Sequence, residues 1–145
     1  MKLPRNLTWA AAASLLTIAG CAGTPSASTS PAQRQLVRSA QTLDDNARVL
    51  AARADTQTPG FAADAHELEQ RTYDLHAAAA SGRASDSELR ADFEKVTRSY
   101  QALRDDVQRL DTPDAHADLA LVDDAYHDVA TRMASVPAGS NAPGS

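Results

Sequence analysis

The sequence predicts an all-α protein, an up-down-up-down bundle of four antiparallel helices. Apolar residues recur at steps of three and four through most of residues 31–136. The strictly alternating pattern that a strand needs is absent, and proline or glycine marks three short breaks in the helical pattern. Helices joined by short connections run antiparallel to their neighbours, which favours a bundle with left-handed packing.

The first helix is expected to start at Ser30-Pro31. Serine is a favoured N-cap, proline suits the first helical position, and Gln33 can complete a capping box. The apolar stripe of this helix runs through Leu36, Ala40, Leu43, Ala47, Leu50 and Ala54. Alanine at every second position should let this helix approach its neighbours most closely.

Residues 55–60 (DTQTPG) separate the first helix from the second. The second stripe runs through Phe61, Ala65, Leu68, Thr72, Leu75 and Ala79. Ser81-Gly82 ends this helix, because glycine is the preferred residue just after a helix C-terminus.

A second capping box, Ser85-Asp86-Ser87-Glu88, opens the third helix. Its stripe runs through Leu89, Phe93, Val96, Tyr100, Leu103, Val107 and Leu110. Thr112-Pro113-Asp114 starts the fourth helix in the same way, and the stripe there runs through Ala115, Leu119, Val122, Tyr126, Val129, Met133 and Val136. Residues 137–145, rich in Pro, Gly and Ser, are expected to form a disordered tail.

The two halves of the helical region resemble each other. Residues 38–45 (RSAQTLDD) match residues 98–105 (RSYQALRD) at five of eight positions, and Asp64-Ala65-His66 is repeated as Asp114-Ala115-His116. A duplicated helical hairpin would produce both matches. Chance similarity in a chain rich in Ala, Asp and Arg would also produce them, so both origins stay open.

The N-terminus has the layout of a signal peptide, because Lys2 and Arg5 precede an uncharged run over residues 7–20. That run is too short to cross a bilayer as a helix, which takes about 20 apolar residues. At its end, Ile18-Ala19-Gly20-Cys21 resembles the lipobox of bacterial lipoprotein precursors. The alternative is an ordinary signal peptide followed by a chance cysteine.

The resemblance implies that residues 1–20 are removed by cleavage after Gly20 and that Cys21 takes a covalent lipid on its sulfur and further acylation on its amine. Two or three acyl chains give stable membrane attachment. The residue after the cysteine is Ala22. By the same resemblance, this residue favours attachment to the outer membrane, facing the periplasm, in a Gram-negative host. Residues 21–30 would then be the lipidated cysteine and a flexible linker, and residues 31–136 the bundle.

Charge narrows the choice of partner. The chain has a formal net charge of −5, and the part after Cys21 has 12 Lys and Arg against 19 Asp and Glu. An acidic chain argues against a nucleic-acid partner and against a polybasic contact with anionic lipid. Because Cys21 is the only cysteine, its lipidation would leave no thiol for disulfides, catalysis or metal binding.

Histidines with nearby carboxylates are the candidate metal ligands, since neutral imidazole is the commonest such ligand. The candidates follow one stripe on each of two helices: His66, Glu69, Tyr73 and His76 on the second, and His116, Asp123 and His127 on the fourth. His66 and His127 should lie further from the apolar seam than His76 and His116. The second and fourth helices are diagonal in such a bundle, so the two stripes should not converge. Boundary histidines paired with carboxylates are the alternative interpretation.

Catalytic and cofactor motifs are absent from the sequence. It contains no G-x-S-x-G, no H-E-x-x-H, no Gly-rich phosphate loop and no Cys-x-x-Cys-His for haem. The aspartate pairs at 44–45, 105–106 and 123–124 are interpreted as a solvated acidic face, with one member of each pair pointing outward. The predicted protein is therefore not an enzyme and carries no cofactor besides the lipid on Cys21.

Tyr73 lies off the apolar stripe and is the candidate contact residue, because exposed aromatic side chains anchor interfaces. The sequence thus predicts a membrane-anchored bacterial lipoprotein that acts as an envelope interaction or structural module with a protein partner. The alternative is a periplasmic binder of a divalent cation or small ligand through the histidine and carboxylate stripes.

Overall fold

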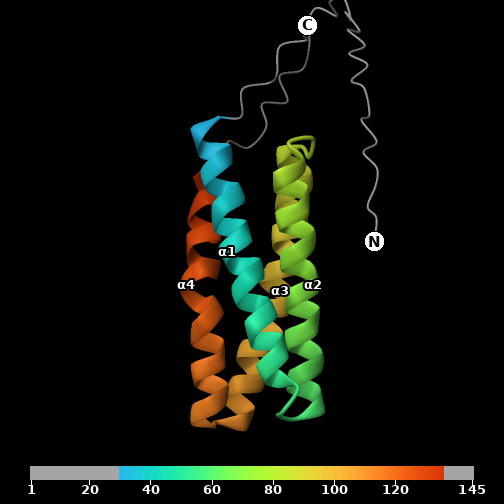
Figure 1. The fold of residues 1–145 in the computed structure, drawn as a ribbon, viewed down its shortest axis with the longest axis vertical. Helices are drawn as coiled ribbons and strands as arrows, with labels where there is room; N and C mark the ends of the chain where they lie inside the picture. Colours follow the sequence, from blue (N-terminus) through green and yellow to red (C-terminus); the bar gives the residue numbers. More distant parts are fainter. Residues whose placement is uncertain (1–29, 136–145) are drawn as a thin grey trace, which may run out of the picture.

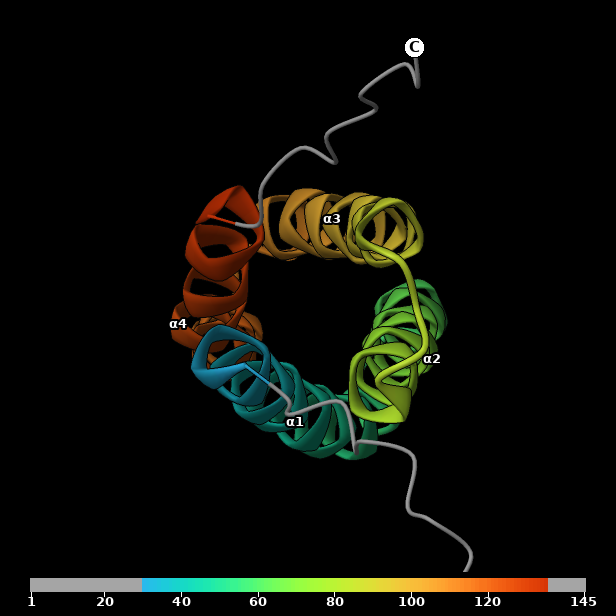
Figure 2. The ribbon, with the colours of Figure 1, turned by 90° about the horizontal axis from the view of Figure 1, so that it is seen from above.

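The computed structural model describes residues 30–135, which form a bundle of four helices (Figure 1). The helices are α1 (Pro31–Ala54), α2 (Pro59–Ser81), α3 (Asp86–Leu110) and α4 (Pro113–Ser135). Seen from above, they form a ring in chain order, in which each helix packs against the two beside it (Figure 2). The predicted all-α up-down-up-down bundle is confirmed. The signal peptide, the lipobox, the linker before Ser30 and residues 136–145 lie outside the described residues.

Capping interactions form at several of the predicted helix ends, although among residues 30–135 no bond from the Gln33 side chain completes the predicted capping box at Ser30. The Ser30 hydroxyl accepts a hydrogen bond from the Gln33 N–H at 3.1 Å. At the start of α3, the Ser85 hydroxyl accepts from the Glu88 N–H at 3.3 Å, and the Glu88 carboxylate accepts from the Ser85 N–H at 2.7 Å. Gly82 follows α2 with φ 62, a left-handed conformation that glycine adopts without steric cost.

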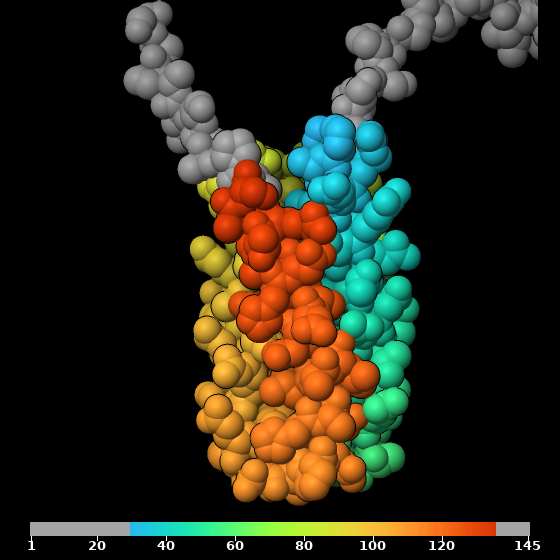
Figure 3. Space-filling view, turned by 90° about the vertical axis from the view of Figure 1, so that its left-hand side faces the viewer, coloured from blue at the N-terminus to red at the C-terminus, as the bar shows by residue number. Residues whose placement is uncertain are grey.

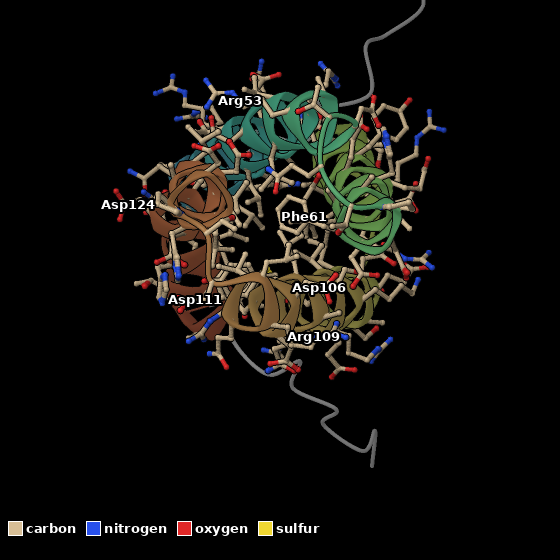
Figure 4. All side chains as sticks on the ribbon, turned by 90° about the horizontal axis from the view of Figure 1, so that it is seen from below. Arg53, Phe61, Asp106, Arg109, Asp111 and Asp124 are labelled. Carbon is tan, nitrogen blue, oxygen red and sulfur yellow. The ribbon has the colours of Figure 1, made fainter. Side chains whose placement is uncertain are left out.

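The core consists mainly of the predicted stripes, and Ala51 and Ala125, which no predicted stripe included, are buried with them. All predicted stripe residues of α1 and α2 are buried, and Phe61 points into the centre of the bundle (Figure 4). Four predicted positions on α3 and α4 are only partly buried: Phe93, Leu110, Leu119 and Tyr126. The backbones of α3 and α4 pack least closely of the four neighbouring pairs, which leaves large side chains between these helices partly accessible.

α1 packs closely against both α2 and α4, but the prediction that it approaches its neighbours most closely is wrong, because α2 packs against α3 more extensively than α1 packs against α4. The buried alanines of α1 are Ala40, Ala47, Ala51 and Ala54. On the side of the molecule where α4 faces the viewer, α4 fills the space between α1 and α3 along the length of the bundle (Figure 3).

The structure corrects the interpretation of the aspartate pairs as a solvated acidic face. Asp44 is 3% exposed and Asp106 is 6% exposed, and the Asp123 carboxylate accepts a hydrogen bond from the Tyr100 hydroxyl. Their chain neighbours are exposed, as expected for one member of each pair: Asp45, Asp105 and Asp124. Successive residues of a helix point about 100° apart, so when one aspartate faces solvent the next turns toward an adjacent helix.

The repeated segments keep the same helix face but not the same place along the helices. Ser39 lies 15 residues before the end of α1, whereas Ser99 lies 11 residues before the end of α3. Asp64 lies five residues after the start of α2, whereas Asp114 is one residue after the start of α4. Both differences are four residues, about one helical turn. Both serines are accordingly buried, each with 6% exposure.

Candidate functional site: the seam between α1 and α2

The predicted residues of the second helix lie on α2 along its seam with α1. Their offsets of three, four and three residues place them on one side of the buried α2 stripe, where they face polar residues of α1. At one end of the seam, Asp55 Oδ1 lies 2.8 Å from His66 Nε2, and His66 Nδ1 lies 3.3 Å from Glu69 Oε2. The imidazole of His66 is therefore held between two carboxylates.

The same series of contacts continues along the seam. Glu69 Oε1 lies 3.7 Å from Arg48 Nε, and Arg48 Nη2 lies 3.3 Å from Asp44 Oδ2. The last contact joins Asp44 Oδ2 to His76 Nδ1 at 3.5 Å. We call this series the polar ladder; its members are Asp55, His66, Glu69, Arg48, Asp44 and His76.

Electrostatics differ between the two ends of the polar ladder. At the exposed end, hydrogen bonds to Asp55 and then to Glu69 raise the pKa of His66 above its ordinary value, because the carboxylates stabilise the imidazolium. At the other end, Asp44 is buried, and among residues 30–135 its Oδ1 atom has no hydrogen-bond partner. A buried carboxylate oxygen without a partner is costly, so Asp44 is the least satisfied member of the ladder.

A groove of about 290 Å³ opens on the seam, lined by Asp44, Arg48, Glu69, Gln70 and Tyr73. The Tyr73 residue is 53% exposed, and the only other exposed large hydrophobic residue in the described part of the chain is Val49 on α1. The groove thus combines an exposed aromatic ring with charged groups from both helices. Such a combination is typical of a contact surface.

The predicted residues of the fourth helix do not come together in the same way. His116 Nε2 lies 3.3 Å from Asp111 Oδ1, while His127 Nδ1 donates to the backbone carbonyl of Asp123 at 2.8 Å. The Asp123 carboxylate binds Tyr100 instead. Because α2 and α4 are diagonal in the ring, the two predicted stripes do not meet, as expected (Figure 2).

Burial of the histidines agrees with the sequence at three of the four positions. His66 and His127 are exposed and His76 is half-buried. The expectation that His116 lies near the apolar seam is wrong, because its side chain is 55% exposed. Ala115, the preceding residue, is 0% exposed, and successive residues of a helix point about 100° apart, so His116 points away from the buried stripe.

Metal binding needs several ligands directed at one point. Within residues 30–135, no group of three or more His, Cys, Asp or Glu side chains is arranged to hold a metal ion. At His66 both ring nitrogens already contact carboxylates. Divalent-cation binding by the two stripes therefore stays a prediction of the sequence.

Asp118 is a buried polar residue that the sequence analysis missed. It is 5% exposed, and its carboxylate accepts hydrogen bonds from Gln57 Nε2 at 2.6 Å and Arg53 Nη1 at 3.3 Å. These bonds join the end of α1 and the α1–α2 connection to α4. A signal was present, since Asp118 falls between Ala115 and Val122 at the spacing of the buried stripe.

The aromatic residues of α3 and α4, which the sequence places on the apolar stripes of the two helices, form a stack. Ring centroids of Phe93 and Tyr126 are 5.7 Å apart, and those of Tyr126 and Tyr100 are 4.0 Å apart. Both hydroxyls have partners: Tyr100 donates to Asp123, and Tyr126 donates to Thr97 Oγ1 at 3.2 Å. Burial, followed by the bond to Asp123, raises the pKa of Tyr100.

Comparison of the chain with protein-family models, with curated proteins and with solved structures found no match. Among the helices of residues 30–135, none is both long and apolar enough to span a membrane.

Proposed function

We propose that the protein is a membrane-anchored bacterial lipoprotein that acts as a non-enzymatic interaction module of the cell envelope. The observation that carries this proposal is the succession of Lys2 and Arg5, an uncharged run, and Ile18-Ala19-Gly20-Cys21. A capped helix then begins at Pro31. A lipid on Cys21 would attach this helical domain to the membrane.

The arrangement of the helices supports this proposal. α1 starts at the end of the bundle where α4 finishes (Figure 1). Residues 22–30 can extend over at most about 30 Å, so a lipid on Cys21 would keep that end of the bundle close to the bilayer. The seam between α1 and α2, which includes Tyr73 and its groove, runs along the length of the bundle. It would therefore be accessible to other proteins of the cell envelope. We propose this seam as the surface that contacts a protein partner.

Replacement of the lipid acceptor tests the anchor. Cys21→Ser should move the full chain from the membrane fraction to the soluble fraction and abolish its labelling with a radioactive or clickable fatty acid. Ala22→Ser is the matched control, because it changes the neighbouring residue and keeps the cysteine. Membrane fractionation and acyl labelling of Cys21→Ser at the level of the control would refute the proposal.

Crosslinking tests the contact surface separately. A photo-crosslinker at exposed Gln70, next to Tyr73, should trap a discrete protein in intact cells, and Tyr73→Ala should reduce the yield. A crosslinker at exposed Gln101 on α3 is the control position. Equal products from both positions would contradict a specific role for the seam.

A further inference from the structure

A second groove lies between α2 and α3, and its charge is opposite to that of the whole domain. Its volume is about 310 Å³, and it is lined by Glu67, Arg71, Lys95, Arg98, Ser99 and Ala102. Three of these residues are cationic and one is anionic, although acidic residues outnumber basic ones in the chain. The groove is therefore a local region of positive charge.

Part of this charge is not neutralised by other groups within residues 30–135. Arg71 Nη2 contacts Glu67 Oε1 at 3.4 Å, and Lys95 Nζ contacts Asp92 Oδ1 at 2.6 Å. In contrast, the exposed guanidinium of Arg98 has no hydrogen-bond or ion-pair partner among residues 30–135. Arg98 therefore has all its donors available to a ligand in the groove.

Ser99 adds a hydroxyl to the same groove. The residue is only 6% exposed, and within the described part of the chain its hydroxyl forms no hydrogen bond. Among residues 30–135, the only buried side-chain nitrogen or oxygen without a hydrogen-bond partner is Asp44 Oδ1, so the Ser99 hydroxyl is accessible to solvent from the groove. A ligand in the groove can therefore accept a hydrogen bond from Ser99 in place of water.

The matching serine of the other hairpin shows what this combination can bind. Ser39, which corresponds to Ser99 in the repeated segments, donates to a carboxylate oxygen of Asp128. The same hydroxyl accepts from Arg132 Nε at 2.6 Å, and Arg132 Nη2 contacts Asp128 at 3.1 Å. At this position the chain thus uses a buried serine and an arginine to hold an oxyanion. At Ser99 the hydroxyl and arginines are present, but no carboxylate in the described part of the chain contacts the hydroxyl.

We propose that the groove between α2 and α3 binds the oxyanion group of a small solute, a phosphate or a carboxylate. Ser99 donates its hydroxyl hydrogen to the oxyanion, and Arg98 and Arg71 supply the positive charge. Guanidinium groups suit this role because their parallel N–H groups match the oxygens of both anions. This site does not depend on the lipid anchor or on the α1–α2 seam.

Isothermal titration calorimetry of the full chain in detergent, at low ionic strength, tests the site. Inorganic phosphate and acetate are the two probes, and saturable binding of at least one with a Kd of about 1 mM is expected. If only phosphate binds, the groove is a phosphate site, and if only acetate binds, it is a carboxylate site. Arg98→Gln and Ser99→Ala should each weaken the binding at least about fivefold.

Arg38→Gln is the matched control, because Arg38 is the exposed counterpart of Arg98 in the repeated segment and the charge change is the same. It should change the affinity less than about twofold. Arg98 is also exposed, so Arg98→Gln leaves the core intact even if Ser99→Ala lowers stability. Absence of saturable binding of both probes, or an equal loss in Arg38→Gln and Arg98→Gln, would overturn the proposal.

Discussion

The α1–α2 and α3–α4 seams join the helices of the two hairpins, yet they are built from different side chains. Between α1 and α2, buried alanines of α1 allow close packing and the polar ladder lines the rim. Between α3 and α4, the backbones are further apart and the stack of Phe93, Tyr126 and Tyr100 fills the space. Side-chain volume along the stripe therefore sets the spacing of helices within one architecture.

This difference predicts opposite sensitivities of the two seams. A seam filled by large rings should be weakened most by removal of a ring, whereas a seam closed by alanines should be weakened by added volume. Charged groups on the rim should contribute least to the free energy of unfolding, because exposed ion pairs stabilise a protein only slightly.

The largest effect is expected from Tyr126→Ala, which removes the middle ring of the aromatic stack. We expect a loss of about 3 kcal/mol in the free energy of unfolding, from the lost contacts and the space left behind. Urea denaturation followed by circular dichroism measures it. Tyr73→Ala, at an exposed tyrosine, is the control and should cost less than about 0.5 kcal/mol. Equal losses in the two variants would contradict the role of the stack.

A smaller effect is expected from Ala47→Leu, at a fully buried alanine of α1. The larger side chain should push α1 away from its neighbours and cost about 2 kcal/mol in the same denaturation experiment. Ala52→Leu adds the same atoms at an exposed position of α1 and should leave the stability nearly unchanged. If Ala47→Leu stabilised the protein instead, the inference that α1 packs closely against its neighbours would be wrong.

The smallest effect is expected at His66 in the polar ladder. Its raised pKa means that its contribution to stability is fully present below pH 6.5 and is lost as the pH rises through the folded-state pKa. NMR titration should show that Asp55→Asn lowers the pKa of His66, because Asp55 is the main cause of the shift. Asp111→Asn, which removes the partner of His116 instead, is the control. A pKa of His66 that is the same in both variants would exclude the contact with Asp55.

Much of the fold could be predicted from the sequence, because the signals that define it are local. Ser30, Ser85 and Gly82 act at helix ends through neighbours at most three residues away. Every predicted stripe residue of α1 and α2 is buried because a spacing of three and four keeps them on one face.

The candidate site was predicted only in part. The sequence brought His66, Glu69, Tyr73 and His76 together on one helix, but it did not pair them with α1. The contact between Asp44 and His76 spans 32 residues of the chain, and it depends on how α1 and α2 are rotated about their axes. Asp118 was missed for a similar reason. Its hydrogen-bond partners among residues 30–135 are Arg53 on α1 and Gln57 in the connection that follows α1, both far from it in the sequence.

Helix periodicity and capping signals, which act within a few residues of the chain, were enough to predict four helices with apolar stripes over residues 31–136, although α2 begins without a side-chain cap at Thr58. The burial of the side chains at the boundary of each stripe, and the groups that they face, depend on how the helices pack against one another. Ser39 and Ser99 show this most clearly: they occupy matching positions in repeated segments, yet one is bound by Asp128 and Arg132 and the other opens onto a cationic groove. The physical reason is that partners of a boundary residue come from a neighbouring helix, and their identity depends on the packing of the whole bundle.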